Sequence, residues 1–320
     1  YGFSLLYGLT GELIFSEISK ILLVNNLSTS PAALLSVMLI LAGIGFKISV
    51  VPFHSWAPDT YEGSPLPVTA YLSVSSKATG FVALMIILTK VFPDSGSSWG
   101  IVLVFISGLT MFIGNLSALQ QSNPVRLLAY SSIAQAGFIL APLAVAGISG
   151  DYADGIYASV TYLIIYAFMN LGAFLVVNVL INTSGSNDIY EWGGLAKHQP
   201  LTAIFTTVFF FSLAGIPPLG GWFAKFVVFR SLLSTGEVYG ITLAIIGAIN
   251  AVIGLVFYAR ISKIIWMDSP SENITINTKP VLLSPLKVVG FISLVITFLA
   301  GIFPNIFSNL GNASALFFNS

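Results

Sequence analysis

Cysteine is absent from this 320-residue sequence, and charged residues are scarce, at 8% of the chain. Without cysteine, the chain forms no disulfide, ligates no iron–sulfur cluster and attaches no c-type haem. Its two histidines, His54 and His198, are too separated for a bis-histidine haem. Soluble domains carry about a quarter charged residues, so this composition cannot supply an aqueous surface. The formal net charge is zero, and no basic field predicts nucleic-acid binding.

Hydrophobic residues make up 56% of the chain and gather in long runs without Asp, Glu, Lys or Arg. These runs are 21–46, 95–125, 127–150, 155–187, 198–224, 238–259 and 288–320. Each is long enough to cross a bilayer, which takes roughly 20 apolar residues as a helix. A transmembrane barrel would show sustained alternation of apolar and polar positions, and these runs do not. The sequence therefore predicts an all-α, polytopic transmembrane helix bundle.

Eight spans are expected after an apolar stretch at 1–8 and a polar loop at about 9–30. The expected spans are 31–56, 65–91, 98–121, 124–148, 155–182, 200–234, 238–267 and 285–306. No soluble linker interrupts them, so we expect 1–320 to form a single transmembrane domain. Because the sequence begins inside an apparent helix, we expect an N-terminally incomplete piece of a longer protein.

Two of these spans are predicted to be discontinuous. Pro52 follows Lys47 in the first span, and the segment 215–221 (GIPPLGG) precedes Lys225 in the sixth. Proline removes a backbone donor and clashes with the preceding turn, which interrupts a helix. Non-helical backbone at membrane depth is tolerated where it is buried in protein or lines a wet cavity, so such breaks indicate an ion or substrate path. A packing kink without functional role is the alternative for each break.

Of the twelve basic residues, three are expected inside spans: Lys47, Lys77 and Lys225. An ammonium at the membrane centre costs on the order of 3 kcal/mol, so each is a candidate functional residue. Desolvation penalises the charged form, which lets a buried lysine exchange a proton near neutral pH. The alternative is that a lysine stem extends to a membrane surface, and we prefer this alternative for Lys90.

All twelve acidic residues are expected in loops or near span ends, so no mid-membrane carboxylate is predicted to pair with Lys47. An anionic partner would have to come from outside this sequence. Polar residues within the expected spans that could pass protons by way of water are Ser75, Ser76, Asn115, Gln135, Tyr162, Tyr166 and Asn170. Each one alone is more often a hydrogen bond between packed helices.

The basic residues outside the membrane predict the orientation of the chain. On one side we expect Arg126, Lys197, Arg260, Lys263, Lys279 and Lys287. On the other side we expect Lys20, Lys90 and Arg230. The first set should face the cytoplasm or its equivalent, with the C-terminus on the opposite face.

Five motifs over about 1–267 resemble the N subunit (subunit 2) of proton-pumping NADH:quinone oxidoreductase, respiratory complex I. They are GFKISVVPFHSWAPDTYEGSP at 45–65, SK at 76–77, GNL at 114–116, RLLAYSS at 126–132 and LAGIPP at 213–218. The resemblance implies a fourteen-helix antiporter-like subunit, here from the end of the sixth helix onward. In that family the seventh, eighth and twelfth helices carry protonatable lysines, which match Lys47, Lys77 and Lys225. A family glutamate on the fifth helix would pair with Lys47.

The resemblance implies a translocase subunit that moves protons through these lysines, coupled to quinone reduction elsewhere in the complex. It implies no cofactor in this chain, with NAD, FMN, iron–sulfur clusters and quinone in other subunits. Expected partners are other membrane-arm subunits, including neighbouring antiporter-like subunits, and the lipid bilayer. We expect the bacterial plasma membrane, with the thylakoid and mitochondrial inner membranes as alternatives.

Two other functions stay open at this point. A subunit of a cation/proton antiporter or membrane-bound hydrogenase has the same fold and lysines, although PDTYEGSP at 58–65 favours the oxidoreductase. A structural membrane scaffold, whose lysines only bind lipid head groups, is the alternative from another class.

Overall fold

A computed structural model of the chain describes residues 1–269 and 284–319, and all regular elements within these ranges are helices. The first seven α-helices are α1 (Gly2–Thr10), α2 (Phe15–Val24), α3 (Pro31–Ile48), α4 (Trp56–Gly63), α5 (Leu66–Tyr71), α6 (Lys77–Lys90) and α7 (Gly96–Leu119). The others are α8 (Pro124–Ser149), α9 (Tyr152–Ser184), α10 (Leu195–His198), α11 (Pro200–Ala214), α12 (Gly220–Ser234), α13 (Val238–Met267), α14 (Ser284–Ile302) and α15 (Pro304–Asn319). The predicted all-α class is confirmed.

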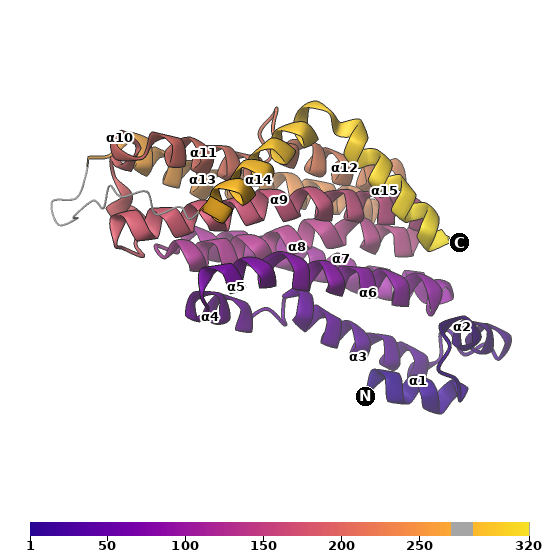
Figure 1. Ribbon diagram of the computed structural model, residues 1–320. Coiled ribbons are helices and arrows are strands. Elements are labelled where there is room, and N and C mark those ends of the chain that lie inside the picture. Colours follow the sequence, from indigo (N-terminus) through magenta and orange to yellow (C-terminus); the bar gives the residue numbers. More distant parts are fainter. Residues whose placement is uncertain (270–283, 320) are drawn as a thin grey trace.

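Among the described residues, six helices are long and apolar enough to cross a membrane, and α14 with α15 form a further, bent candidate. The long helices run roughly alongside one another in one elongated bundle (Figure 1). Helix α8 is almost entirely buried within it. Apolar side chains such as Phe105 and Val252 are exposed on the outside, as contact with lipid requires. The chain is a multi-pass membrane protein.

Both predicted breaks are present. Helix α3 ends at Ile48, and residues 49–55 are non-helical before α4 begins. Helix α11 ends at Ala214, and α12 begins at Gly220. The residues that follow α3 and α11, Ser49 and Gly215, have positive φ angles of 58° and 97°, a left-handed conformation that closes a helix.

Three expected boundaries were wrong. The stretch 9–30, which we expect to be a loop, contains the helix α2. This helix buries Ile18 and Leu22, which lie one helical turn apart. The apolar stretch 1–8 continues as helix to Thr10. The last span ends at Ile302, and the chain turns by 89° into α15, because Pro304 cannot continue the hydrogen-bond pattern of α14.

The bundle has two ends, which we call end A, where α4 and α10 lie, and end B, where α2 and the C-terminus lie (Figure 1). Four basic residues expected on one side lie on elements that meet at end A: Arg126, Lys197, Arg260 and Lys263. Lys20, Lys90 and Arg230 lie on elements that meet at end B. Lys279 and Glu272 lie outside the described residues, as does the side chain of Lys287.

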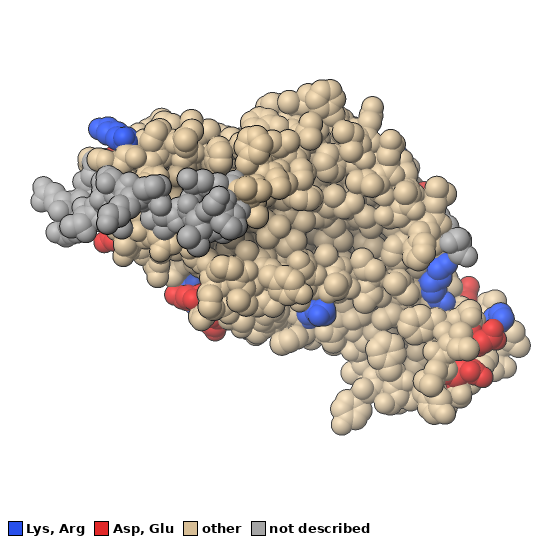
Figure 2. Space-filling view, in the orientation of Figure 1, with Lys and Arg blue, Asp and Glu red and all other residues tan. Residues whose placement is uncertain are grey.

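Charged side chains lie mostly toward the two ends of the face shown in Figure 2, and the long surface between them shows one isolated basic group near its lower edge. This distribution fits a molecule whose middle is surrounded by lipid. Which end faces the cytoplasm stays a prediction.

Candidate functional site

Lys77 lies at the junction between a π-helical turn, Leu72–Ser76, and α6. Only 2% of its surface is exposed. Its ammonium Nζ donates to the Ser132 carbonyl at 3.0 Å and to the Ser132 hydroxyl at 2.5 Å. A π-helical turn widens a helix locally and often occurs at functional sites. Lys77 therefore has protein hydrogen-bond acceptors inside the bundle and does not extend to a membrane surface.

Several aromatic and polar side chains surround the Lys77 contact. The Tyr61 and Tyr166 hydroxyls lie close enough to Ser132 to interact with its hydroxyl. Tyr61 is fully buried, and its hydroxyl makes no well-formed hydrogen bond with the described part of the chain. Asn170 donates from Nδ2 to the Ser73 hydroxyl at 2.8 Å. The surroundings of Lys77 thus hold several groups that can donate or accept a proton.

Lys225 lies at the second break, where α11 gives way to α12. It is 6% exposed, and its Nζ donates to the Ala214 carbonyl at 2.6 Å and to the Leu213 carbonyl at 3.1 Å. The last carbonyls of a helix have no intrahelical donor and carry the negative end of its dipole. Lys225 therefore caps the half-helix α11, and its Nζ also lies 5.1 Å from the centre of the Phe138 ring.

The position of Lys225 depends on Gly215. A Cβ atom at this position would lie 2.8 Å from Lys225 Cδ, and the residue has a φ of 97°, which glycine adopts without strain. The break thus provides both the free carbonyls and the space for the lysine stem.

Polar side chains of α8 and α13 join the two lysine sites. Gln135 donates from Nε2 to the Leu213 carbonyl at 3.1 Å and to the Tyr258 hydroxyl at 3.4 Å. The Tyr258 hydroxyl is 2.5 Å from the Ser131 hydroxyl. Tyr162 donates its hydroxyl proton to Gln135 Oε1. Gln135 therefore shares the Leu213 carbonyl with Lys225 and is linked to Ser131 through Tyr258.

These contacts form two buried groups, one at each lysine, which we together call the central series. Its members are Lys77, Ser132, Ser131, Tyr258, Gln135, the Leu213 carbonyl and Lys225. Ser131 and Ser132 are consecutive residues of α8, so one peptide unit separates the two halves of the series. Hydroxyl groups donate and accept at once, which is what a proton relay requires.

Lys47 differs from the other two lysines. It lies in the last turn of α3 and is exposed in this structure, so the expectation that all three lysines are buried is wrong for Lys47. Its Cγ comes within 3.5 Å of the Cβ position of Gly80 on α6, one helical turn beyond Lys77. Among the described residues it forms no ion pair. It is thus near the central series without belonging to it.

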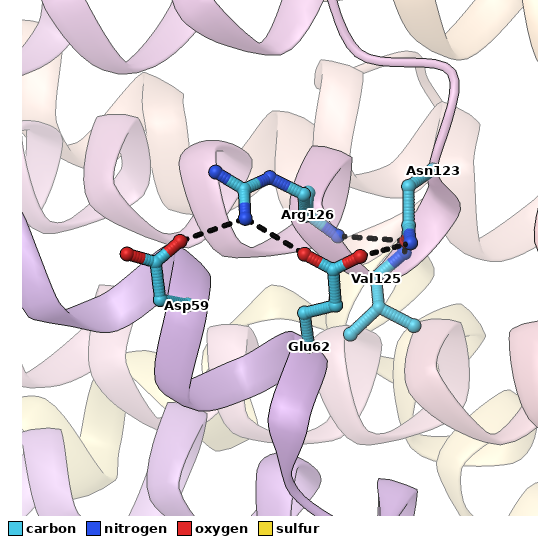
Figure 3. Close-up of polar contacts among 5 residues, drawn as sticks. All are labelled: Asp59, Glu62, Asn123, Val125 and Arg126. Atoms are coloured by element: carbon cyan, nitrogen blue, oxygen red, sulfur yellow. Dashed lines mark hydrogen bonds and ion pairs between the residues drawn. The ribbon is translucent and has the colours of Figure 1, made fainter.

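At end A an arginine holds α4 against the start of α8 (Figure 3). Arg126 Nη1 lies 2.7 Å from Asp59 Oδ1 and 2.7 Å from Glu62 Oε2. Asn123 donates to Glu62 Oε1 at 2.9 Å, and its own Oδ1 accepts from the Val125 backbone N–H at 2.8 Å. These exposed ion pairs add little stability individually. They do position α4, whose buried Tyr61 lies between the two acidic residues in sequence and faces Ser132.

The site also contains residues that the sequence prediction missed. Of the predicted polar residues, Gln135 and Tyr162 are bonded into the series, whereas Asn115 pairs with Asn250 elsewhere, donating to its side-chain oxygen at 3.1 Å. The series members Ser131, Ser132 and Tyr258 were not predicted, nor was Tyr61. The RLLAYSS motif at 126–132 was a signal for the serines. Within residues 1–269 and 284–319, no group of three or more His, Cys, Asp or Glu residues could hold a metal ion.

Comparison with known proteins gives a consistent result. The family model described as NADH:quinone oxidoreductase/Mrp antiporter, TM, matches residues 1–254. The NADH-quinone oxidoreductase subunit N of Moorella thermoacetica is 40% identical over 319 residues, covering 99% of this chain and 64% of that protein. The NAD(P)H-quinone oxidoreductase subunit 2 of Trichormus variabilis is 38% identical over 322 residues, covering 98% of this chain and 60% of that protein. The chain thus spans a little under two thirds of the length of these relatives.

Solved structures show the same fold. A chain of respiratory complex I from Thermus thermophilus, with bound aureothin, superposes with a TM-score of 0.75 at 27% identity, covering 97% of this chain and 64% of that chain. A chain of the Mrp complex from Dietzia sp. superposes with a TM-score of 0.85 at 23% identity, covering 98% of this chain and 64% of that chain. A chain of an archaeal membrane-bound sulfane sulfur reductase superposes with a TM-score of 0.84 at 26% identity, covering 98% of this chain and 61% of that chain.

Proposed function

This chain belongs to the NADH:quinone oxidoreductase/Mrp antiporter membrane family, and we propose that it is a proton-translocating subunit of an NADH:quinone oxidoreductase. Protons move through Lys77 and Lys225, driven by quinone reduction elsewhere in the complex. On this proposal the chain is part of a translocase, and 1–320 acts as one transmembrane domain. NAD, FMN, iron–sulfur clusters and quinone belong to other subunits.

The observation that carries the proposal is the central series. Two buried ammonium groups lie at its ends, and side chains that donate and accept hydrogen bonds lie between them. In a bundle with so few charged residues, two desolvated lysines joined by polar groups would be an expensive arrangement without a function.

A transfer between the lysines would use these contacts together with water. When Lys77 gives a proton toward Ser132, the Ser132 hydroxyl has to pass one on, and water would carry it to the neighbouring Ser131 hydroxyl, which contacts Tyr258. Gln135 donates to the Tyr258 hydroxyl and to the Leu213 carbonyl and so holds both beside Lys225. Because an amide and a carbonyl do not relay a proton, water would also carry it from Tyr258 to Lys225. A charge that reaches one lysine raises the energy of a charge on the other, because charges interact over longer range in a low dielectric. This repulsion would move the proton onward.

Lys47 has a different part in the proposal. As the exposed lysine next to Gly80, it would exchange protons with a carboxylate outside the described residues and control loading of Lys77. The family glutamate implied by the resemblance would be that partner. Neighbouring antiporter-like subunits and other membrane-arm subunits are the proposed protein partners.

The alternative, a subunit of an antiporter or of another respiratory membrane complex, is supported by the likeness to the sulfane sulfur reductase chain. The sequence identities of 38–40% to quinone oxidoreductase subunits favour the first function. Copurification of the intact protein with subunits that catalyse NADH-dependent quinone reduction distinguishes the two.

Replacement of Lys225 tests the proposal. In the full-length protein within its assembled complex, Lys225→Ala should reduce proton pumping into vesicles about tenfold or more and slow the coupled quinone reduction. Lys90→Ala is the matched control, because Lys90 lies at the end B terminus of α6, away from the central series, and should leave both rates unchanged. Normal pumping by an assembled Lys225→Ala complex would refute the proposal.

A further inference from the structure

A polar cavity of about 480 Å³ opens at end B between α9, α12 and α15. Its polar lining consists of Asp151, Asp154, Tyr157, Arg230, Ser308 and Asn312. A smaller hollow adjoins it between α8, α9 and α12, shares Asp151 and Asp154, and is also lined by Ser231 and Thr235, but as packed it is too small to hold a water molecule. Helix α15 lies on the side of the bundle away from α1 and α3 (Figure 1).

Asp154 stands at the boundary between the cavity and the packed interior. Its Oδ1 is 3.5 Å from Arg230 Nη2, a long contact, and its side chain is 20% exposed. Its Oδ2 is buried and has no hydrogen-bond partner among the described residues. The Arg230 guanidinium lies 5.7 Å from the centre of the Tyr157 ring, which fixes its place beside the carboxylate. One carboxylate oxygen thus interacts with a cation near water, and the other has a free lone pair inside.

The interior next to Asp154 belongs to the same helices that carry the Lys225 site. Along α12, Ser231 lies six residues beyond Lys225, a rise of about 9 Å. Along α9, Tyr162 lies eight residues beyond Asp154, about 12 Å, and donates to Gln135. We call the packing between α8, α9 and α12 the seam, and water would have to enter it to carry a proton over the distance from the central series to the cavity.

Unsatisfied polar groups occur along and beside this seam. Pro142, which lines the smaller hollow, has no N–H for the Phe138 carbonyl one turn earlier, and the Phe138 ring contacts Lys225. The Thr161 hydroxyl is buried without a partner in the described part of the chain and faces Gly311 of α15. Buried polar groups without protein partners are the groups that ordered water bridges.

We propose that Asp154 is the proton-transfer residue between Lys225 and the water at end B, with Arg230 as its positioning residue. The inference rests on the proposed function of the chain. A proton leaves the Lys225 ammonium, crosses the seam by way of water and bonds to an Asp154 carboxylate oxygen. The carboxylic acid then gives the proton to water in the cavity and returns to the carboxylate. With end A toward the cytoplasm, this step is release on the opposite side.

Arg230 positions Asp154 in this arrangement. The charged or titratable groups facing Asp154 are Asp151 and Tyr157 from its own helix and Arg230 from α12. The lining from α8 and α15 is uncharged, with Ser149, Ser308 and Asn312. Loss of the arginine would leave the Asp154 carboxylate without the cation that lies beside its Oδ1.

The test uses the assembled complex in vesicles with controlled pH on each side. Asp154→Asn should reduce proton pumping about tenfold or more, and Asp154→Glu should restore most of it. Asp151→Asn is the matched control, because Asp151 lines the same cavities and its side chain caps α9, a role that asparagine also fills. It should pump normally. Arg230→Gln should assemble and pump more slowly, and Arg230→Lys, which keeps a cation beside Asp154, should restore most of the rate.

The possible outcomes separate the two proposals when Lys225→Ala is measured in parallel. Loss of pumping with Lys225→Ala, and normal pumping with assembled Asp154→Asn, would overturn the role of Asp154 and leave the proposed function standing. Normal pumping with both would refute the proposed function itself. If Asp154→Asn does not assemble, normal pumping by assembled Arg230→Gln together with impaired pumping by assembled Asp154→Glu would point to a structural carboxylate and overturn the inference.

Discussion

Gln135 is the residue on which the two halves of the central series depend. It contacts the Leu213 carbonyl beside Lys225 and the Tyr258 hydroxyl next to Ser131. Gln135→Leu keeps a similar volume but removes both of these bonds and the one that Oε1 accepts from Tyr162. We expect proton pumping to fall about tenfold, the change in rate that corresponds to about 1.4 kcal/mol, close to the net value of one hydrogen bond. Pumping by vesicles that contain the assembled complex is the measurement.

Thr206→Val serves as the control for Gln135→Leu. Thr206 is also fully buried and polar, but its hydroxyl donates within its own helix, to the Thr202 carbonyl at 2.7 Å. This variant should assemble and pump normally. Equal loss in both variants would mean that pumping responds to general packing defects and not to the central series.

Single residues could be predicted from the sequence where their charge is costly. Lys77 and Lys225 were singled out because few charged residues lie inside the spans, and both are buried. The exposure of Lys47 could not be predicted, since it depends on which helices pack against α3. Tyr258 could not be predicted either, because a tyrosine in a long apolar helix is usually a packing residue, and its partner Ser131 is 127 residues away.

At the scale of helices, the break before α12 needs glycine at one position. Gly215→Ala places a Cβ atom 2.8 Å from Lys225 Cδ and puts a side chain on left-handed backbone. The backbone strain costs about 1–2 kcal/mol. We expect a lower thermal unfolding temperature together with a loss of pumping, because the lysine stem is displaced.

Gly185→Ala separates these two effects. Gly185 follows α9 with a φ of 72°, and nothing lies within 4 Å of its Cβ position. The substitution should destabilise the chain by a similar amount and leave pumping unchanged. If Gly185→Ala also abolished pumping, backbone strain alone would explain the behaviour of Gly215→Ala.

Helix breaks are predictable where proline and glycine cause them. Pro52 and the segment 215–221 interrupt their spans as expected, because the missing donor and the steric clash are local properties. Helix α2 was missed because only Ile18 and Leu22 of its ten residues are buried, which makes its apolar pattern short. Pro304 explains why α14 ends, but the 89° direction that α15 then takes, packed against α9, could not be predicted from the sequence.

The whole molecule should show opposite labelling at its two ends. The chain has no cysteine, so labelling of a single introduced cysteine can be measured without labelling of any other residue of this chain. Lys197→Cys at end A should react with a membrane-impermeant maleimide from the cytoplasmic side, and Lys20→Cys at end B from the opposite side. Inverted and right-side-out vesicles provide the two comparisons. Labelling of both cysteines from one side would contradict the membrane orientation.

Leu140→Cys is the negative control for this labelling experiment. Leu140 is fully buried in α8, and its cysteine should react from neither side until the protein is denatured. Reaction in the native state would show that water reaches the centre of the bundle at a position where packing is closed.

The adjacency of Ser131 and Ser132 ties the two lysine sites together mechanically. One hydroxyl contacts Tyr258 on the Lys225 side, and the next contacts Lys77. Both belong to α8, which is almost entirely buried among the other helices. A small rotation of α8 about its long axis would change both contacts together. Such a motion at one lysine site would therefore reach the other.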